Sequence, residues 1–103
     1  MTVTFRPDAL SDYEAICEEA HYRYPGHAVK IIGRMLSVFE RVEMFPRSAP
    51  EVEPPLANFP GMRFESMPGV GHHVIYYQVF ESEVQIIRII HGRMDHRAVF
   101  GEA

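Results

Sequence analysis

The chain has 103 residues, of which 47% are hydrophobic, and a formal net charge of -4. This composition is typical of a packed globule and excludes a disordered tail, and the length predicts one domain over residues 1–103. The acidic balance excludes a global positive field that would concentrate nucleic acid, so direct sequence-specific binding of nucleic acid is not expected.

The N-terminal half predicts a strand followed by a helical hairpin. Residues 2–5 are β-branched or aromatic and lie just before a proline, which favours a short strand and then a helix start. Apolar residues recur at helical spacing over residues 9–24 and again over 28–42. Because only a short Pro25-Gly26 turn separates these segments, the two helices should form an antiparallel hairpin.

The C-terminal half predicts antiparallel strands. Residues 46–60 carry prolines among acidic residues, which predicts an extended surface loop. Strand patterns then cover residues 62–67, 72–80 and 84–91, and the turns between them, at Pro68-Gly69-Val70-Gly71 and at 81–83, are short. The predicted fold class is α+β, with an N-terminal strand and an antiparallel helical hairpin packed on a mainly antiparallel twisted sheet that a three-strand C-terminal meander completes.

The last predicted strand is apolar on both faces. Strand alternation places Ile87 and Ile89 on one face and Val84, Ile86 and Ile90 on the other. The helical hairpin can cover only one of these faces. The other face needs either the proline-bearing loop and the C-terminal tail, or a partner protein, and the sequence leaves both alternatives open.

Cysteine and histidine content suggests neither a disulfide nor a metal site. The lone cysteine, Cys17, falls at an apolar helical position, which predicts a buried thiol. His72 and His73 are adjacent on a strand and point to opposite faces, so they cannot easily share one ion. We expect no metal, no cofactor and, because no leader or spanning apolar run occurs, a cytoplasmic protein without membrane contact.

Short motifs accompany these elements in a fixed order. They are Phe5-Arg6-Pro7-Asp8-Ala9, Phe45-Pro46, Gly61-Met62-Arg63, Val74-Ile75-Tyr76-Tyr77-Gln78-Val79 and Ile87-Arg88-Ile89-Ile90-His91-Gly92-Arg93-Met94-Asp95. In this order and spacing, nearly the whole chain resembles the RelE/ParE superfamily of bacterial toxin–antitoxin modules. The resemblance implies the RelE/ParE-like form of the fold predicted above.

The superfamily has two branches with different chemistry. RelE-type members are ribosome-dependent ribonucleases, and the resemblance implies two arginines and a tyrosine at positions that hold Val74, Met94 and Phe100 in this chain. None of these three side chains can transfer a proton or hold a phosphate. The resemblance therefore favours the ParE branch, whose members are not enzymes, inhibit DNA gyrase and are neutralised by a ParD-type antitoxin in a hetero-oligomer.

The predicted contact surface centres on the turn at residues 90–95. Candidate residues for contact with the target or the antitoxin are Arg63, Arg88, His91, Arg93, Asp95, His96 and Arg97. Arg63 and Arg88 have an alternative role, because either arginine can pair with Glu65 or Glu83 across the sheet. A RelE-like mRNA ribonuclease that uses the histidines and the aspartate of this surface is one alternative function, and a non-catalytic interaction module is another.

Overall fold

The computed structural model describes residues 1–67 and 72–101, so the predicted turn at Pro68-Gly69-Val70-Gly71 lies outside the described residues. The elements are β1 (Thr2–Phe5), α1 (Pro7–Arg23), α2 (Ala28–Met44), β2 (Arg63–Met67), β3 (His73–Val79), β4 (Glu83–His91) and α3 (His96–Val99). Within the described ranges, no helix has the length and hydropathy to cross a membrane.

The four strands form one mixed sheet with the order β1-β4-β3-β2. Strands β2, β3 and β4 pair antiparallel as a meander, whereas β1 pairs parallel with β4. A parallel pair needs a long crossover connection, and the chain from α1 to β3 supplies it. The predicted α+β fold, with its helical hairpin and three-strand meander, is confirmed.

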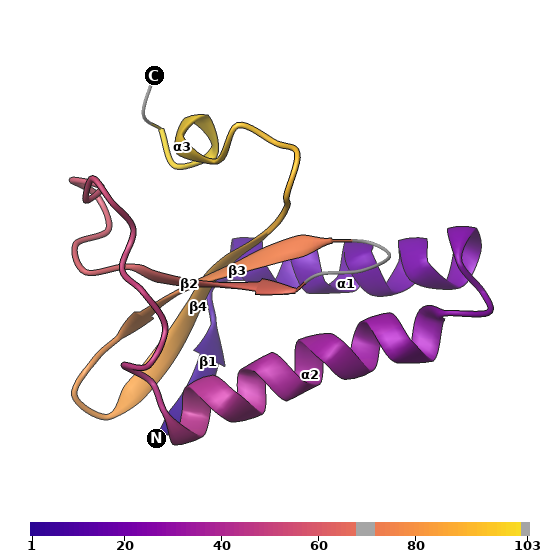
Figure 1. The fold of residues 1–103 in the computed structure, drawn as a ribbon, viewed down its shortest axis with the longest axis horizontal. Helices are drawn as coiled ribbons and strands as arrows, with labels where there is room; N and C mark the ends of the chain where they lie inside the picture. The colour runs from indigo at the N-terminus through magenta and orange to yellow at the C-terminus, as the bar shows by residue number, and fades with distance from the viewer. Residues whose placement is uncertain (68–71, 102–103) are drawn as a thin grey trace.

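The helical hairpin covers one face of the sheet (Figure 1). Helix α2 turns a stripe at helical spacing toward the strands, with Ile31, Met35 and Val38 all buried. This stripe packs against α1 and against the sheet residues Ile75, Tyr77, Val84, Ile86 and Ile89 in one hydrophobic cluster, which we call the hairpin core. Cys17 was expected to be buried, but its thiol is only half-buried at the margin of this core.

The opposite face of the sheet is covered by the loop after α2 and by α3, which lies above the strands in Figure 1. The buried residues of this second cluster are Leu56, Met62, Val74, Tyr76, Ile87, Ile90 and Phe100, and we call it the loop core. The loop and the C-terminal tail therefore close this face, and no partner is needed to bury it.

The predicted division of the β4 side chains was wrong. Val84, Ile86 and Ile89 lie in the hairpin core, whereas Ile87 and Ile90 lie in the loop core. The cause is an irregularity in the pairing of β3 with β4, where Tyr76 pairs with Arg88 but Tyr77 pairs with Ile86. Residue 87 is thus an extra residue in β4, and such a bulge shifts the alternation of every side chain after it.

Candidate functional site

The chain turns sharply after β4 and enters α3. Residues 91–97 form a surface that we call the C-terminal turn surface. Met94 N–H donates to His91 C=O at 3.1 Å, and the Asp95 carboxylate accepts from Ala98 N–H at 3.3 Å. Asp95 therefore acts as the N-cap of α3, a helix that the sequence analysis missed. Arg93 and Met94 are exposed at the tip of this turn.

Both ring nitrogens of His96 are engaged in hydrogen bonds. Nε2 lies 2.9 Å from His91 C=O, and Nδ1 contacts the Tyr76 hydroxyl. A carbonyl oxygen can only accept, so Nε2 carries a hydrogen in its contact with His91 C=O. Burial raises the pKa of Tyr76 and so favours its protonated, donating form. His96 thus fastens α3 to the sheet.

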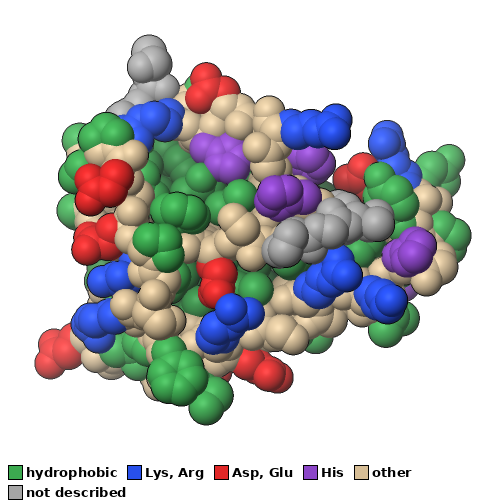
Figure 2. Space-filling model, in the orientation of Figure 1, with side chains coloured by type: hydrophobic (Ala, Val, Ile, Leu, Met, Phe, Trp, Pro, Cys, Tyr) green, Lys and Arg blue, Asp and Glu red, His purple; other side chains and the backbone are tan. Residues whose placement is uncertain are grey.

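His91 is exposed and packs on the end of β3. Its Nδ1 accepts from Arg93 N–H at 3.2 Å, and its ring meets the buried His73 ring edge to face at 5.3 Å between centroids. Gly92 follows, and a Cβ at that position would lie 3.3 Å from the His72 ring. The segments just beyond the ends of β3 and β4 therefore approach each other closely at this point. Figure 2 shows histidine side chains gathered on this part of the molecule.

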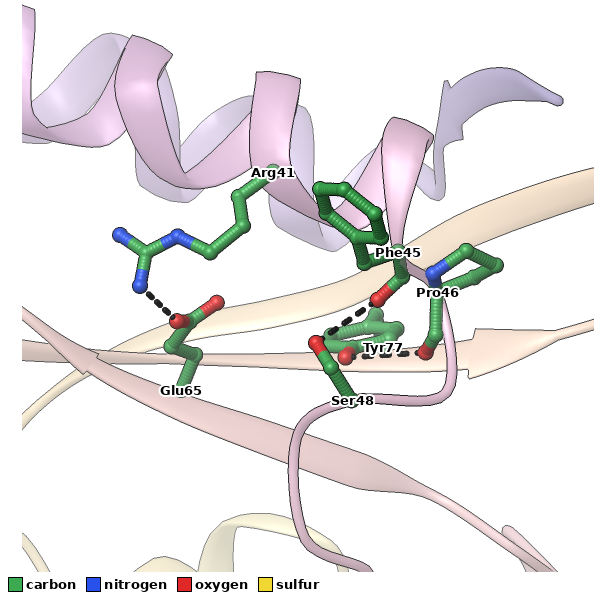
Figure 3. A network of polar contacts seen from close by, with 6 residues as sticks. All are labelled: Arg41, Phe45, Pro46, Ser48, Glu65 and Tyr77. Atoms are coloured by element: carbon green, nitrogen blue, oxygen red, sulfur yellow. Dashed lines mark hydrogen bonds and ion pairs between the residues drawn. The ribbon is translucent and has the colours of Figure 1, made fainter.

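Arg97 and Arg63 hold the loop that closes the loop core. Arg97 Nη1 donates to Pro54 C=O at 3.0 Å, and Arg63 Nη1 donates to the carbonyls of Arg47 and Ala49 at 3.2 and 2.6 Å. The alternative pairing of Arg63 with Glu65 does not occur, because Glu65 pairs with Arg41 on α2 (Figure 3), and Arg63 Nη2 lies 3.8 Å from Glu51 instead. Arg63 therefore positions the chain after α2 and lies outside the C-terminal turn surface.

Arg88 joins β4 to α1. Its Nε and Nη2 donate to the two carboxylate oxygens of Asp12 at 2.7 and 3.0 Å, and the same carboxylate accepts from Ile89 N–H at 2.9 Å. The hydrogen bond with Asp12 raises the pKa of Arg88. Pairing with Glu83 was wrong, since Glu83 accepts from the Thr4 hydroxyl instead. Arg88 is thus a structural residue in this chain.

The three positions where the resemblance to RelE-type members implies ribonuclease residues hold apolar side chains in different surroundings. Val74 and Phe100 are 8% and 6% exposed and lie in the loop core, while Met94 is 53% exposed. Among the described residues, no group of three or more His, Cys, Asp or Glu side chains has the geometry to hold a metal ion. The C-terminal turn surface brings together five of the predicted residues, which are His91, Arg93, Asp95, His96 and Arg97.

A second surface was not predicted from the sequence. Between α2 and β2 lies a groove of about 650 Å³, which we call the α2–β2 groove. It is lined by Lys30, Gly33, Arg34, Ser37, Val38, Arg41, Ser66 and Met67. The ion pair between Arg41 and Glu65 joins its two walls, and the Tyr77 hydroxyl donates to Pro46 C=O at 3.1 Å nearby (Figure 3). The α2 charges had been interpreted only as an outward-facing polar side.

A family model for the ParE toxin of the type II toxin–antitoxin system parDE matches residues 3–96. The chain belongs to this ParE toxin family. It is therefore a toxin of a type II toxin–antitoxin system, and membership in such a family implies an antitoxin partner. A search of curated proteins found no match.

Solved structures share the fold at low sequence identity. The chromosomal ParDE toxin–antitoxin system of P. aeruginosa matches with a TM-score of 0.68 and 18% identity, over 88% of this chain and 95% of that chain. A YoeB/ParE toxin from Agrobacterium tumefaciens matches with a TM-score of 0.61 and 14% identity, over 88% of this chain and 98% of that chain. The YoeB dimer from Staphylococcus aureus matches with a TM-score of 0.59 and 14% identity, over 88% of this chain and 95% of that chain. These matches support the fold.

Proposed function

We propose that this ParE-family toxin acts on DNA gyrase by binding, without catalysis, and that a ParD-type antitoxin neutralises it. The observation that carries the non-catalytic part is the state of His96. Both of its ring nitrogens already lie in hydrogen bonds within the chain, to Tyr76 and to His91 C=O, which supports a role in holding the turn. Gyrase as the target rests on the family resemblance.

The exposed residues of the C-terminal turn surface suit protein contact. Arg93 offers forked donors and Met94 an adaptable apolar side chain, and both stand at the tip of a turn that hydrogen bonds fix on either side. Arginine is enriched among the residues that dominate binding energy at protein interfaces. We therefore assign the gyrase contact to this tip, which implies that the protein works in the cytoplasm.

A RelE-like ribonuclease is the weaker alternative. It is favoured by the proximity of His91, Asp95 and His96 on one surface. Against it, Val74 and Phe100 are buried apolar residues at two of the positions where the resemblance implies catalytic groups. Asp95 is also committed to capping α3, so the polar residues of this surface mainly hold the turn in shape.

The antitoxin is assigned to the outer side of the helical hairpin and not to the loop core. Exposed apolar side chains occur there on both helices, with Leu10 at 47%, Leu36 at 46% and Val29 at 84% exposure. Exposed apolar groups of this kind mark surfaces for protein partners. An antitoxin segment that folds on binding would cover them, and its degradation when unbound would release the toxin.

The target is tested with purified gyrase and translating ribosomes. The toxin is titrated into a supercoiling assay, and the same preparation is added to translating ribosomes while mRNA ends are mapped. We expect inhibition of supercoiling and no new mRNA ends. Cleavage of mRNA without inhibition of gyrase would replace this proposal with the ribonuclease, and neither effect would leave a non-catalytic interaction module.

A further inference from the structure

The side chain of His91 fixes the backbone at the tip of the C-terminal turn surface. Its Nδ1 accepts from Arg93 N–H at 3.2 Å, while His91 C=O accepts from Met94 N–H at 3.1 Å. The contact with Nδ1 has the form of an Asx-turn, in which an aspartate or asparagine side chain binds the N–H two residues further on. The orientation of the Arg93 backbone therefore depends on the His91 ring.

This hydrogen bond requires a neutral His91 ring. A backbone N–H can only donate, so Nδ1 must offer a lone pair to Arg93. In the protonated ring both nitrogens carry hydrogen and neither can accept. Histidine is the side chain that ordinarily changes its charge between about pH 5 and 8. Proton uptake by His91 within this range would thus remove the acceptor that Arg93 uses.

The charge of a protonated His91 would lie beside a small cavity between α1, β3 and the end of β4, with a volume of about 120 Å³. The Glu19 carboxylate in this cavity is 3.4 Å from Nε of Arg23, an exposed residue of the same helix, so its charge is already balanced. On β3, the His73 ring is 8% exposed and meets the His91 ring at 5.3 Å. The ionisable side chains that line the cavity are Glu19, Arg23, Tyr24, His73 and His91.

The groups on the other side of His91 belong to the turn and to α3. Arg93 carries a positive charge two residues away, and the Asp95 carboxylate already accepts from Ala98 N–H at 3.3 Å. His96 Nε2 lies 2.9 Å from the His91 carbonyl oxygen, and the His72 ring lies against Gly92. A proton on His91 would therefore add a second positive charge to the tip.

We propose that His91 is a positioning residue for the gyrase contact, and that its neutral ring holds Arg93 in place while its protonated ring releases it. A released tip must be ordered again when it binds, and this ordering lowers affinity. Inhibition of gyrase therefore weakens as the pH falls. The contact with gyrase rests on the proposed function, whereas the dependence of the turn on the charge of His91 follows from its hydrogen bond to Arg93.

The variants His91→Asn and His91→Leu separate the acceptor from the charge. Asparagine Oδ1 can accept from Arg93 N–H as in an Asx-turn and does not titrate, and leucine has the same branched shape without an acceptor. In NMR spectra of the full chain between about pH 5.5 and 8, we expect the Arg93 amide to follow the titration of the His91 ring. The same amide should stay in place in His91→Asn, and in His91→Leu it should exchange with solvent at least about threefold faster than in His91→Asn.

Two results of the NMR titration would overturn the inference. One is an Arg93 amide that does not move while the His91 ring titrates. The other is an equal movement in the unaltered chain and in His91→Asn, since titration of His72, His73 or His96 would then be its cause.

The effect on gyrase is measured as the concentration that halves supercoiling, at about pH 8 and pH 6. The increase between these two values should be at least about threefold larger for the unaltered chain than for His91→Asn, because the loss of one hydrogen bond separates them. Equal increases would overturn the proposal. If the Arg93 amide follows His91 but the unaltered chain does not inhibit gyrase at either pH, the proposed function is wrong and the role of His91 in the turn stands.

Discussion

The two faces of the sheet are closed in different ways. The hairpin core is covered by two regular helices of 17 residues each, and its buried side chains are mostly aliphatic, although Phe5 and Phe39 also meet edge to face there. The loop core is covered by an irregular segment and a helix of four residues, and its rings meet edge to face, with Tyr76 4.9 Å from Phe100. The difference indicates that the hairpin core sets global stability, while the loop core mainly positions the C-terminal turn surface.

The largest expected losses of stability come from truncating one buried side chain in each core to alanine. Met35→Ala in the hairpin core should lower the free energy of unfolding by about 4 kcal/mol, because helices on a sheet cannot collapse into the cavity. Leu56→Ala in the loop core should cost about 2 kcal/mol, since the loop can relax. Urea unfolding measures both, with the exposed Leu36→Ala as control. An equal or larger loss for Leu56→Ala would reverse the comparison.

The next largest loss of stability should come from removing the hydrogen bonds between α1 and β4. Asp12→Ala removes the carboxylate that accepts from Arg88 and from Ile89 N–H, which should cost about 2 kcal/mol of unfolding free energy. Asp8→Ala, at an exposed position of the same helix, should cost about 0.5 kcal/mol through the helix dipole and a weaker charge interaction with Arg88. If the two variants unfold at the same urea concentration, the Asp12 contact carries no stability.

Removal of the hydrogen bond that holds α3 to the sheet should give a smaller and local loss of stability. Tyr76→Phe keeps the ring contact with Phe100 but removes the hydrogen bond to His96, at a cost of about 1 kcal/mol. Hydrogen exchange should become faster at residues 96–100 and remain unchanged in α2. A uniform acceleration over the whole chain would show that the two cores are not separable in this way.

The smallest expected effect is a decline of stability at alkaline pH, caused by the titration of two tyrosines. Burial raises the pKa of Tyr76, and burial followed by the Glu65 charge raises that of Tyr77. Above about pH 10 the unfolded chain loses these protons while the folded chain retains them, so stability falls as the pH rises. Urea midpoints between about pH 8 and 11 should therefore decline, and the decline should be shallower in Tyr76→Phe.

The sequence was sufficient for elements whose contacts are local. The apolar spacing along α2 and the Pro25-Gly26 turn predicted the hairpin, and the short turn at residues 81–83 predicted the antiparallel pairing of β3 with β4. These features depend on the period of a helix or a strand, which is written in neighbouring residues. Their bounds agree with the prediction to within a residue or two.

What the sequence did not predict depends on residues far apart in the chain. Asp12 and Arg88 are 76 positions apart, and no periodicity links them. The bulge at Ile87 arises from pairing with β3, so alternation alone assigned the β4 faces wrongly. The α2–β2 groove was missed because it exists only where α2 approaches the outer edge of β2. In contrast, Asp95 before α3 carried a local N-cap signal that was available.

The central claim is tested most directly by measuring how well a variant inhibits gyrase when the charge at the tip of the C-terminal turn surface is reversed. Arg93→Glu leaves the hydrogen bonds of the turn in place, because within residues 1–67 and 72–101 Arg93 contributes only its backbone N–H, to His91. The concentration that halves supercoiling should rise at least about tenfold for Arg93→Glu and less than about twofold for Arg23→Glu. If Arg93→Glu inhibits gyrase as well as the unaltered chain does, the contact lies elsewhere and the assignment of this surface is wrong.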